Sequence, residues 1–139
     1  MIYEYYVIRK LKKQSMDNIL KMGKELRQKK NKPNEWLFKL MYKHIELLCK
    51  VEPIVKKYNL MCYNRSLVLY YLASKCGIDI AFCIGFRKKI TLEQKRILVG
   101  HAWIEWKGEV LEKDNKVKYY IKNSKYYNYE KKEQKNNVI

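Results

Sequence analysis

The first half of the chain carries apolar residues at the spacing of amphipathic helices. Ser15 has a side chain that commonly caps a helix, and the apolar positions after it predict a helix through about Lys29. A polar break containing Pro33 comes next, and a broad apolar stripe then predicts a second helix from about Glu35 to Cys49. The N-terminal part of the chain is therefore expected to be helical.

A third helical region follows Pro53. Residues 54–58 are expected to form a short further turn, and residues 62–76 are apolar nearly all the way round, which predicts a helix buried on most sides. Gly77 suits the left-handed residue that ends such a helix. Asn59 lies just ahead of the helix and is a candidate for its N-terminal cap.

Downstream of this helix the chain consists of short runs of β-forming residues separated by turn signals. Four strands are predicted, at residues 78–86, 97–106, 109–112 and 117–121. A polar loop over 87–94 is expected between the first two. Lys107-Gly108 is a two-residue hairpin turn. From Asn123 onward the residues are polar and basic with little to bury, so we expect a frayed tail.

Helices followed by an antiparallel meander predict an α+β fold. A length of 139 residues fits one domain. We place that domain at residues 1–122, with a helical part over 1–58 and the central helix plus sheet over 59–122; residues 123–139 form the basic polar tail. The buried central helix starts at a cysteine and packs on a sheet that carries a histidine. This order resembles the ground plan of papain-like and transglutaminase-like cysteine enzymes.

The charge of the chain is strongly positive. There are 31 Lys and Arg residues against 14 Asp and Glu residues, which gives a formal net charge of +17. The lysines are spread along the chain, so we interpret them as solvated surface and predict no nucleic-acid binding. The surplus charge can still attract an acidic partner over long range, an effect that salt weakens.

The sequence contains no sign of a membrane or secretory protein. No apolar run reaches the ~18 residues needed to span a bilayer. The N-terminus lacks the apolar core and small-residue cleavage site of a signal peptide. We therefore expect a cytoplasmic protein without membrane insertion.

The four cysteines match neither a metal site nor a disulfide framework. No pair is spaced C-x-x-C, and neither histidine is close to a cysteine in the sequence. No metal and no cofactor are predicted. Cys49, Cys76 and Cys83 are interpreted as small buried apolar residues. Cys62 differs, because it opens the buried helix.

Cys62 and His101 form a candidate catalytic pair. The unpaired N–H groups and partial positive charge of a helix N-terminus favour a thiolate and can hold an oxyanion. His101 lies within a predicted strand between two small residues, where it can accept the thiol proton and later protonate a leaving amine. Alone, such a cysteine is usually a core residue and such a histidine usually structural. Their combination with a nearby acid raises the case for catalysis.

The hairpin predicted at Lys107-Gly108 brings acids beside the histidine. With that turn, His101 pairs with Asp114 and Trp103 pairs with Glu112, and alternation places both acids on the His101 face. Asp114 lies directly across and Glu112 on the diagonal. The orienting acid is therefore Asp114 or Glu112, and the pairing favours Asp114.

Several short sequence words resemble the lasso-peptide leader peptidases, the B-proteins whose protease domain has a transglutaminase-like fold. The words occur in the family's order over about residues 55–115. They are CYNRSL at 62–67, GI at 77–78, IGFR at 84–87 and HAWIE at 101–105. The resemblance implies a cysteine protease in which Cys62 is the nucleophile and His101 the base and acid. The family's acid position falls here on Lys113, which leaves Asp114 and Glu112 as alternatives.

The resemblance also implies a pathway and partners. The family removes the leader from a ribosomally synthesised precursor peptide, and a macrolactam-forming cyclase then closes the ring. The chain lacks the length for the leader-recognition domain that some members carry, so a separate leader-recognition protein is expected. Arg65 matches the motif arginine and, one turn into the helix, is expected to fix local packing or pair with an acid. Trp103 shares the His101 face and either shields the imidazole or is plain core.

Two alternative functions differ in whether they need Cys62 and His101. A transglutaminase or amidase on the same fold would use the same Cys62 and His101. A non-enzymatic basic binding protein would need neither side chain, and its binding would fall steeply with salt.

Overall fold

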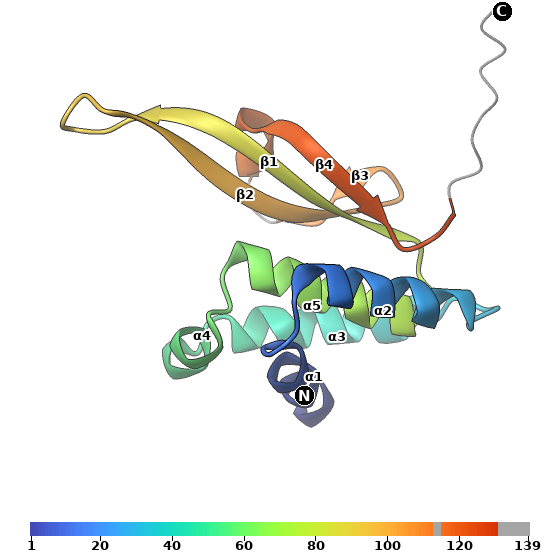
Figure 1. The fold of residues 1–139 in the computed structure, drawn as a ribbon. Helices are drawn as coiled ribbons and strands as arrows, with labels where there is room; N and C mark the ends of the chain where they lie inside the picture. Colours follow the sequence, from blue (N-terminus) through green and yellow to red (C-terminus); the bar gives the residue numbers. More distant parts are fainter. Residues whose placement is uncertain (113–114, 131–139) are drawn as a thin grey trace, which may run out of the picture.

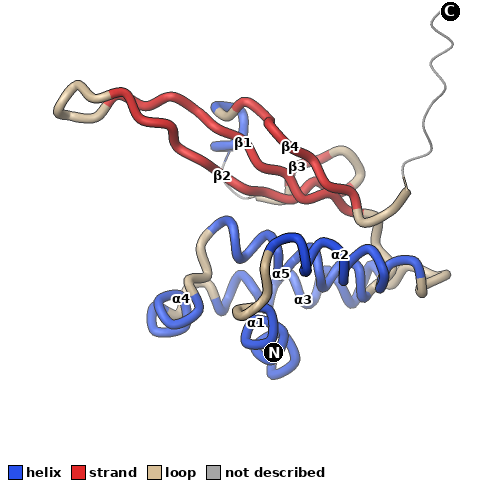
Figure 2. Tube along the Cα trace, viewed as in Figure 1, coloured by secondary structure: helices blue, strands red, loops and turns tan. Residues whose placement is uncertain are grey.

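In the part of the chain that the structure describes, five α-helices lie on one side of a four-stranded antiparallel sheet (Figures 1 and 2). This computed structural model describes residues 1–112 and 115–130, and it has the predicted α+β fold. The helices are α1 (Ile2–Leu11), α2 (Met16–Gln28), α3 (Glu35–Leu48), α4 (Glu52–Tyr58) and α5 (Cys62–Lys75). The strands are β1 (Ile80–Ile90), β2 (Arg96–Trp106), β3 (Glu109–Val110) and β4 (Ile121–Tyr127), with a 3-10 helix, η1, at Asn115–Tyr119.

The predicted amphipathic helices are confirmed with their caps. Ser15 accepts a hydrogen bond from the backbone N–H of Asn18 at the start of α2, and Asn34 caps α3 in the same way. Helix α1 was not predicted. It forms because Val7 and two further apolar residues of its inner face are buried, and because the buried Glu4 carboxylate binds both the N-terminal ammonium and His44.

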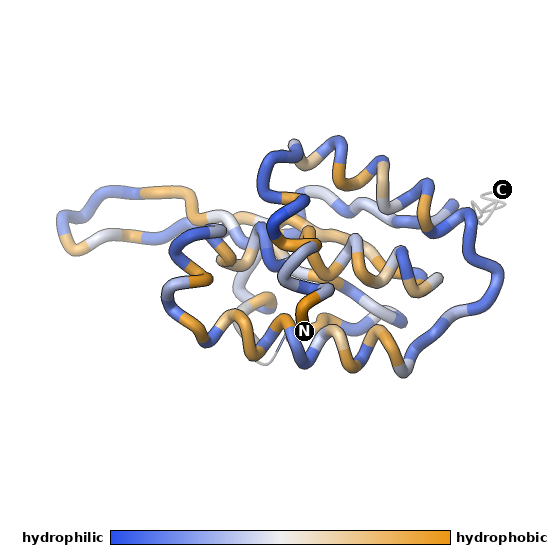
Figure 3. Tube along the Cα trace, turned by 90° about the horizontal axis from the view of Figure 1, so that it is seen from below, coloured by the Kyte–Doolittle hydropathy of each residue, from blue (hydrophilic) through white to orange (hydrophobic). Residues whose placement is uncertain are grey.

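Helix α5 forms the centre of the molecule, as its apolar sequence predicts. All of its residues from Ser66 to Ser74 are buried, and Gly77 ends it with a φ of 72°. The predicted cap was wrong: Asn59 has a φ of 48° and closes the preceding helix α4, while Met61 occupies the N-cap position of α5. Figure 3 shows the apolar positions recurring along the helices.

The sheet has the strand order β3-β2-β1-β4. The hairpin turn is confirmed, because Lys107 and Gly108 have φ values of 53° and 77°, as a tight two-residue turn requires. The loop predicted at 87–94 was wrong in its first part. β1 continues to Ile90 because the ladder with β2 satisfies its backbone groups although its side chains are exposed. The third strand is shorter than predicted.

The C-terminal part of the sheet departs from the predicted meander. The strand predicted at 117–121 is instead largely η1, and the chain crosses to the far side of β1, where β4 pairs antiparallel with it. The tail predicted from Asn123 was therefore wrong for 123–127, because backbone pairing to β1 orders this polar segment. Residues 131–139 of that prediction lie outside the described residues.

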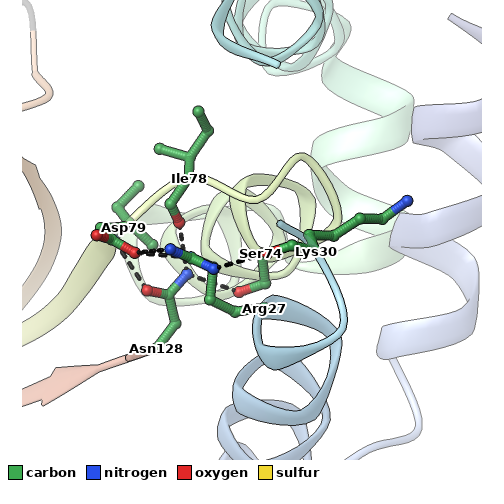
Figure 4. A network of polar contacts seen from close by, with 7 residues as sticks. Arg27, Lys30, Ser74, Ile78, Asp79 and Asn128 are labelled. Atoms are coloured by element: carbon green, nitrogen blue, oxygen red, sulfur yellow. Dashed lines mark hydrogen bonds and ion pairs between the residues drawn. The ribbon is translucent and has the colours of Figure 1, made fainter. Parts of the chain in front are cut away.

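Asn128 ties the end of β4 to the loop between α5 and β1 (Figure 4). Its amide nitrogen donates to the Ser74 hydroxyl at 3.0 Å and to the Ile78 carbonyl at 2.8 Å, and its oxygen accepts from the Ile80 N–H at 2.9 Å. The side chain is completely buried. In the same view Arg27 forms a 2.6 Å ion pair with Asp79. Within residues 1–112 and 115–130, no helix is long and apolar enough to cross a bilayer.

Asn128→Ala should lower the free energy of unfolding by about 2–4 kcal/mol, because it leaves several buried polar groups without partners. Asn123→Ala is the matched control, since Asn123 is exposed on β4, which ends just before Asn128; it should change stability by less than about 0.5 kcal/mol. Urea unfolding followed by circular dichroism measures both. Equal effects would contradict the assigned role of Asn128.

Candidate active site

Cys62, His101 and Glu112 line one cavity of about 330 Å³ between α5, β2 and the segment after β3. They come from three separate parts of the chain, and the fold brings them together. Asp114, the acid that the hairpin pairing favoured, lies outside the described residues.

The position of Cys62 follows from the start of helix α5. The first helical hydrogen bond runs from the Arg65 N–H to the Met61 carbonyl, and no side chain of the described residues caps this terminus. The N–H groups of the first turn are thus directed beyond the helix end. One turn further on, the buried Ser66 hydroxyl donates to the Ala102 carbonyl at 3.3 Å. This bond, which the sequence did not reveal, attaches the first turns of α5, and with them Cys62, to the residue that follows His101 on β2.

His101 is oriented by Glu112. Its Nε2 lies 2.7 Å from Glu112 Oε1, and both side chains are largely buried. An ionised carboxylate only accepts, so Nε2 carries the proton and Nδ1 carries the lone pair of the neutral ring. The register predicted around the turn is confirmed for Glu105 with Val110, and the Leu111 N–H extends it by bonding to Ile104.

The imidazole also lies in a stack of aromatic rings. Its centroid is 5.9 Å from that of Trp103 and 4.9 Å from that of Tyr120, with interplanar angles of 23° and 29°. Gly85 pairs with His101 across the strands, and a Cβ there would approach the Trp103 ring to 2.7 Å. Trp103 therefore both fills the core and covers the imidazole. Tyr120 was missed as a site residue, because only the crossing by η1 brings it here.

Glu105 holds Trp103 in place. This buried carboxylate accepts the Trp103 indole N–H at 3.0 Å, the Cys83 S–H at 3.2 Å, and ammonium groups of Lys122 and Lys125 at 2.7 and 3.0 Å. Burial raises the pKa of Glu105, but these donors outweigh it and lower the pKa to about 2. Alternation along β2 puts Glu105 on the same face as His101, but the network itself was not predicted.

Arg65 lines the cavity beside Tyr42 and Glu46. Burial and the hydrogen bond to Glu46 raise the pKa of Tyr42 to about 12, and Arg65 acts in the opposite direction. The arginine of the C-x-x-R word thus belongs to a polar group on the wall of the cavity, next to helix α3. This place suits a packing and pairing role.

The other three cysteines have different surroundings. Burial raises the pKa of Cys76 to about 11, and burial together with Glu105 raises that of Cys83 to about 12. Their predicted burial is confirmed. Cys49 is only half-buried and lines the same cavity as Cys62, so its predicted full burial was wrong; desolvation still raises its pKa.

Two other hollows of the surface lack this combination of residues. One of about 660 Å³ lies between α2 and β4, and one of about 370 Å³ lies at the turn between β2 and β3. Neither is lined by a cysteine or a histidine. Among the residues that the structure describes, no three potential ligands gather as a metal site.

The chain belongs to the transglutaminase-like superfamily, whose family model matches residues 10–124. Comparisons with curated proteins and with solved structures gave no match. The matched region includes the helix that begins at Cys62, the strand with His101, and Glu112. The fold is thus that of a superfamily of cysteine-protease-type enzymes and acyl transferases.

Glu105 makes the stability of the fold depend on acidity. Because its pKa in the folded protein, about 2, lies below the ordinary 4.5, its contribution is complete above about pH 4.5 and is lost as the pH falls towards 2. We expect wild type to lose up to about 3 kcal/mol relative to Glu105→Gln over that interval. Urea unfolding at a series of pH values measures this difference. A constant difference would contradict the network, and Glu93→Gln, an exposed substitution, is the control.

Iodoacetamide should alkylate Cys62 faster than the other cysteines, because burial raises the pKa of those three thiols. His101→Ala should slow the alkylation of Cys62 by about tenfold or more, and Glu112→Gln should slow it less, since the ring stays in place. Peptide mass spectrometry after timed labelling gives all four rates. Uniform labelling, or a Cys62 rate unchanged by His101→Ala, would exclude an activated pair.

Proposed function

We propose that this protein is a cysteine peptidase that removes the leader from a ribosomally synthesised precursor peptide of the lasso-peptide type. The observation that carries the proposal is the 2.7 Å bond between His101 and Glu112 on the wall of the cavity that also holds Cys62. The leader as substrate is supported by the sequence words shared with the B-protein peptidases.

The proposed reaction begins with proton transfer from the Cys62 thiol to His101 Nδ1, while Glu112 stabilises the resulting imidazolium. The thiolate attacks the scissile carbonyl, and N–H groups at the start of α5 hold the oxyanion. When the tetrahedral intermediate collapses, the imidazolium protonates the leaving amine. Water then attacks the thioester with His101 as the base, which releases the acid and restores the thiol.

The proposal includes partners but no cofactor. Nothing in the reaction requires a metal or an organic group, because the attacking atom, the base and the oxyanion donors come from the chain. We propose that a separate leader-recognition protein presents the precursor and that a macrolactam-forming cyclase uses the core peptide afterwards. The same machinery would transfer the acyl group to an amine if an amine replaced water.

A library of quenched fluorescent peptides, incubated with and without dansylcadaverine, tests the proposed function. Wild type should hydrolyse a subset of peptides, and Cys62→Ala or His101→Ala should reduce kcat by at least about 10³-fold. Glu112→Gln should reduce it by about 10²-fold because a neutral amide stabilises the imidazolium less.

Glu109→Gln is the matched control for Glu112→Gln, since Glu109 is exposed on β3 and its loss should leave kcat unchanged within twofold. Mass spectrometry of the products separates hydrolysis from amine incorporation. Preferred incorporation of dansylcadaverine would assign a transglutaminase-type activity instead. Cleavage that survives Cys62→Ala would contradict both cysteine mechanisms.

A further inference from the structure

The β1–β2 hairpin extends well beyond the rest of the sheet and beyond the helices (Figures 1 and 2). β1 and β2 pair as far as Ile90 and Arg96, whereas β4 reaches only Phe86 of β1 and β3 pairs only with Glu105 and Trp106 of β2. Its outer part, residues 88–98, we call the ribbon. Along the ribbon, neither edge is paired with another strand of the described residues.

The ribbon combines exposed apolar side chains with positive charge. Ile90 and Leu98 are 70% and 64% exposed and share one face, and Figure 3 shows the apolar positions along this projecting part. Its charged residues are almost all basic: Lys88, Lys89, Lys95 and Arg96 against Glu93. An isolated two-stranded ribbon is marginally stable in water and gains from further pairing. The complementary partner is an extended peptide with acidic and apolar residues.

The free edge of β2 leads directly to the candidate active site. The Ile104 carbonyl accepts from the Leu111 N–H on the β3 side, and in an antiparallel strand the backbone groups of alternate residues point to the same edge. Ala102, Gly100 and Leu98 therefore direct their N–H and C=O groups to this edge.

The end of that edge is already occupied. The Ala102 carbonyl accepts a hydrogen bond from the Ser66 hydroxyl, but no strand of the described residues pairs with Gly100 or Leu98 on this edge. Gly100 immediately precedes His101. A peptide strand paired with Leu98 and Gly100 would thus run into the cavity that holds Cys62.

We propose that the substrate peptide binds by adding a strand to this edge of β2. An extended acidic segment beside the scissile bond pairs with the backbone of Leu98 and Gly100, and the basic side chains of the ribbon bind its carboxylates. The edge continues to His101, which favours the substrate over a partner protein as the occupant. Only the identity of the bound peptide as substrate rests on the proposed function.

The test measures binding without catalysis. A fluorescein-labelled eight-residue peptide of alternating Val and Glu is titrated against Cys62→Ala protein by fluorescence anisotropy, with a Val and Lys peptide as the comparison. We expect binding of the acidic peptide alone, weakened about tenfold between 50 and 300 mM NaCl. Failure of the acidic peptide to bind, or equal binding of both peptides, would overturn the proposal.

Two proline variants locate the bound strand. Leu98→Pro removes an N–H from the proposed edge, and Ile90→Pro, the matched control, removes one from the opposite edge by the same alternation. In the Cys62→Ala background Leu98→Pro should weaken binding about tenfold, and Ile90→Pro should change it less than twofold. Both should melt within a few degrees of the parent, because neither N–H belongs to the β1–β2 ladder.

The result separates this proposal from the proposed function. Loss of peptide binding with Ile90→Pro alone would place the peptide on the other edge of the ribbon. Unchanged binding in both variants would show that the peptide does not pair with either edge. Both results overturn the proposal. Binding that depends on Leu98 remains a positive result even if wild type cleaves no peptide. In that case the edge is a peptide site, whatever the outcome of the peptidase assay.

Discussion

Helix α5 is buried on most of its surface, and the remaining elements are arranged around it. Its buried stretch from Ser66 to Ser74 contacts α2 and α3 on one side and the sheet on the other. Neither end can shift without exposing apolar surface or breaking the bonds that Ser66 and Ser74 make to other segments. The cysteine at its first turn is therefore held at a fixed place beside β2.

The histidine is held as firmly as the cysteine, by different interactions. Glu112 fixes one ring nitrogen, while the stacked rings of Trp103 and Tyr120 restrict the tilt of the imidazole. Trp103 is in turn fixed by the buried carboxylate of Glu105. The proposed proton transfer would therefore need little reorganisation of these side chains.

The sequence words that resemble the leader peptidases correspond to connected contacts in the fold. The first word supplies Cys62 and the hydroxyl of Ser66 that bonds to β2, and the I-G-F-R word supplies the glycine that makes room for Trp103. The H-A-W-I-E word then supplies the histidine, its covering ring and the carboxylate that holds that ring. The first and last of these words are distant along the chain, and both supply residues that line the cavity.

The sequence by itself determined the amphipathic helices, the buried central helix and the hairpin turn, because local periodicity, capping and turn chemistry specify them. It also predicted Cys62 and His101 as a candidate pair, and the fold places both on the wall of one cavity. Only the tertiary structure decided the course of β4, the length of the β1–β2 ribbon, and the contacts of Tyr120 and Glu105. Backbone pairing orders polar segments such as 121–127 whatever their side chains, so hydropathy gives no signal for them. The contact between Glu112 and His101 likewise depends on where the chain turns after β3.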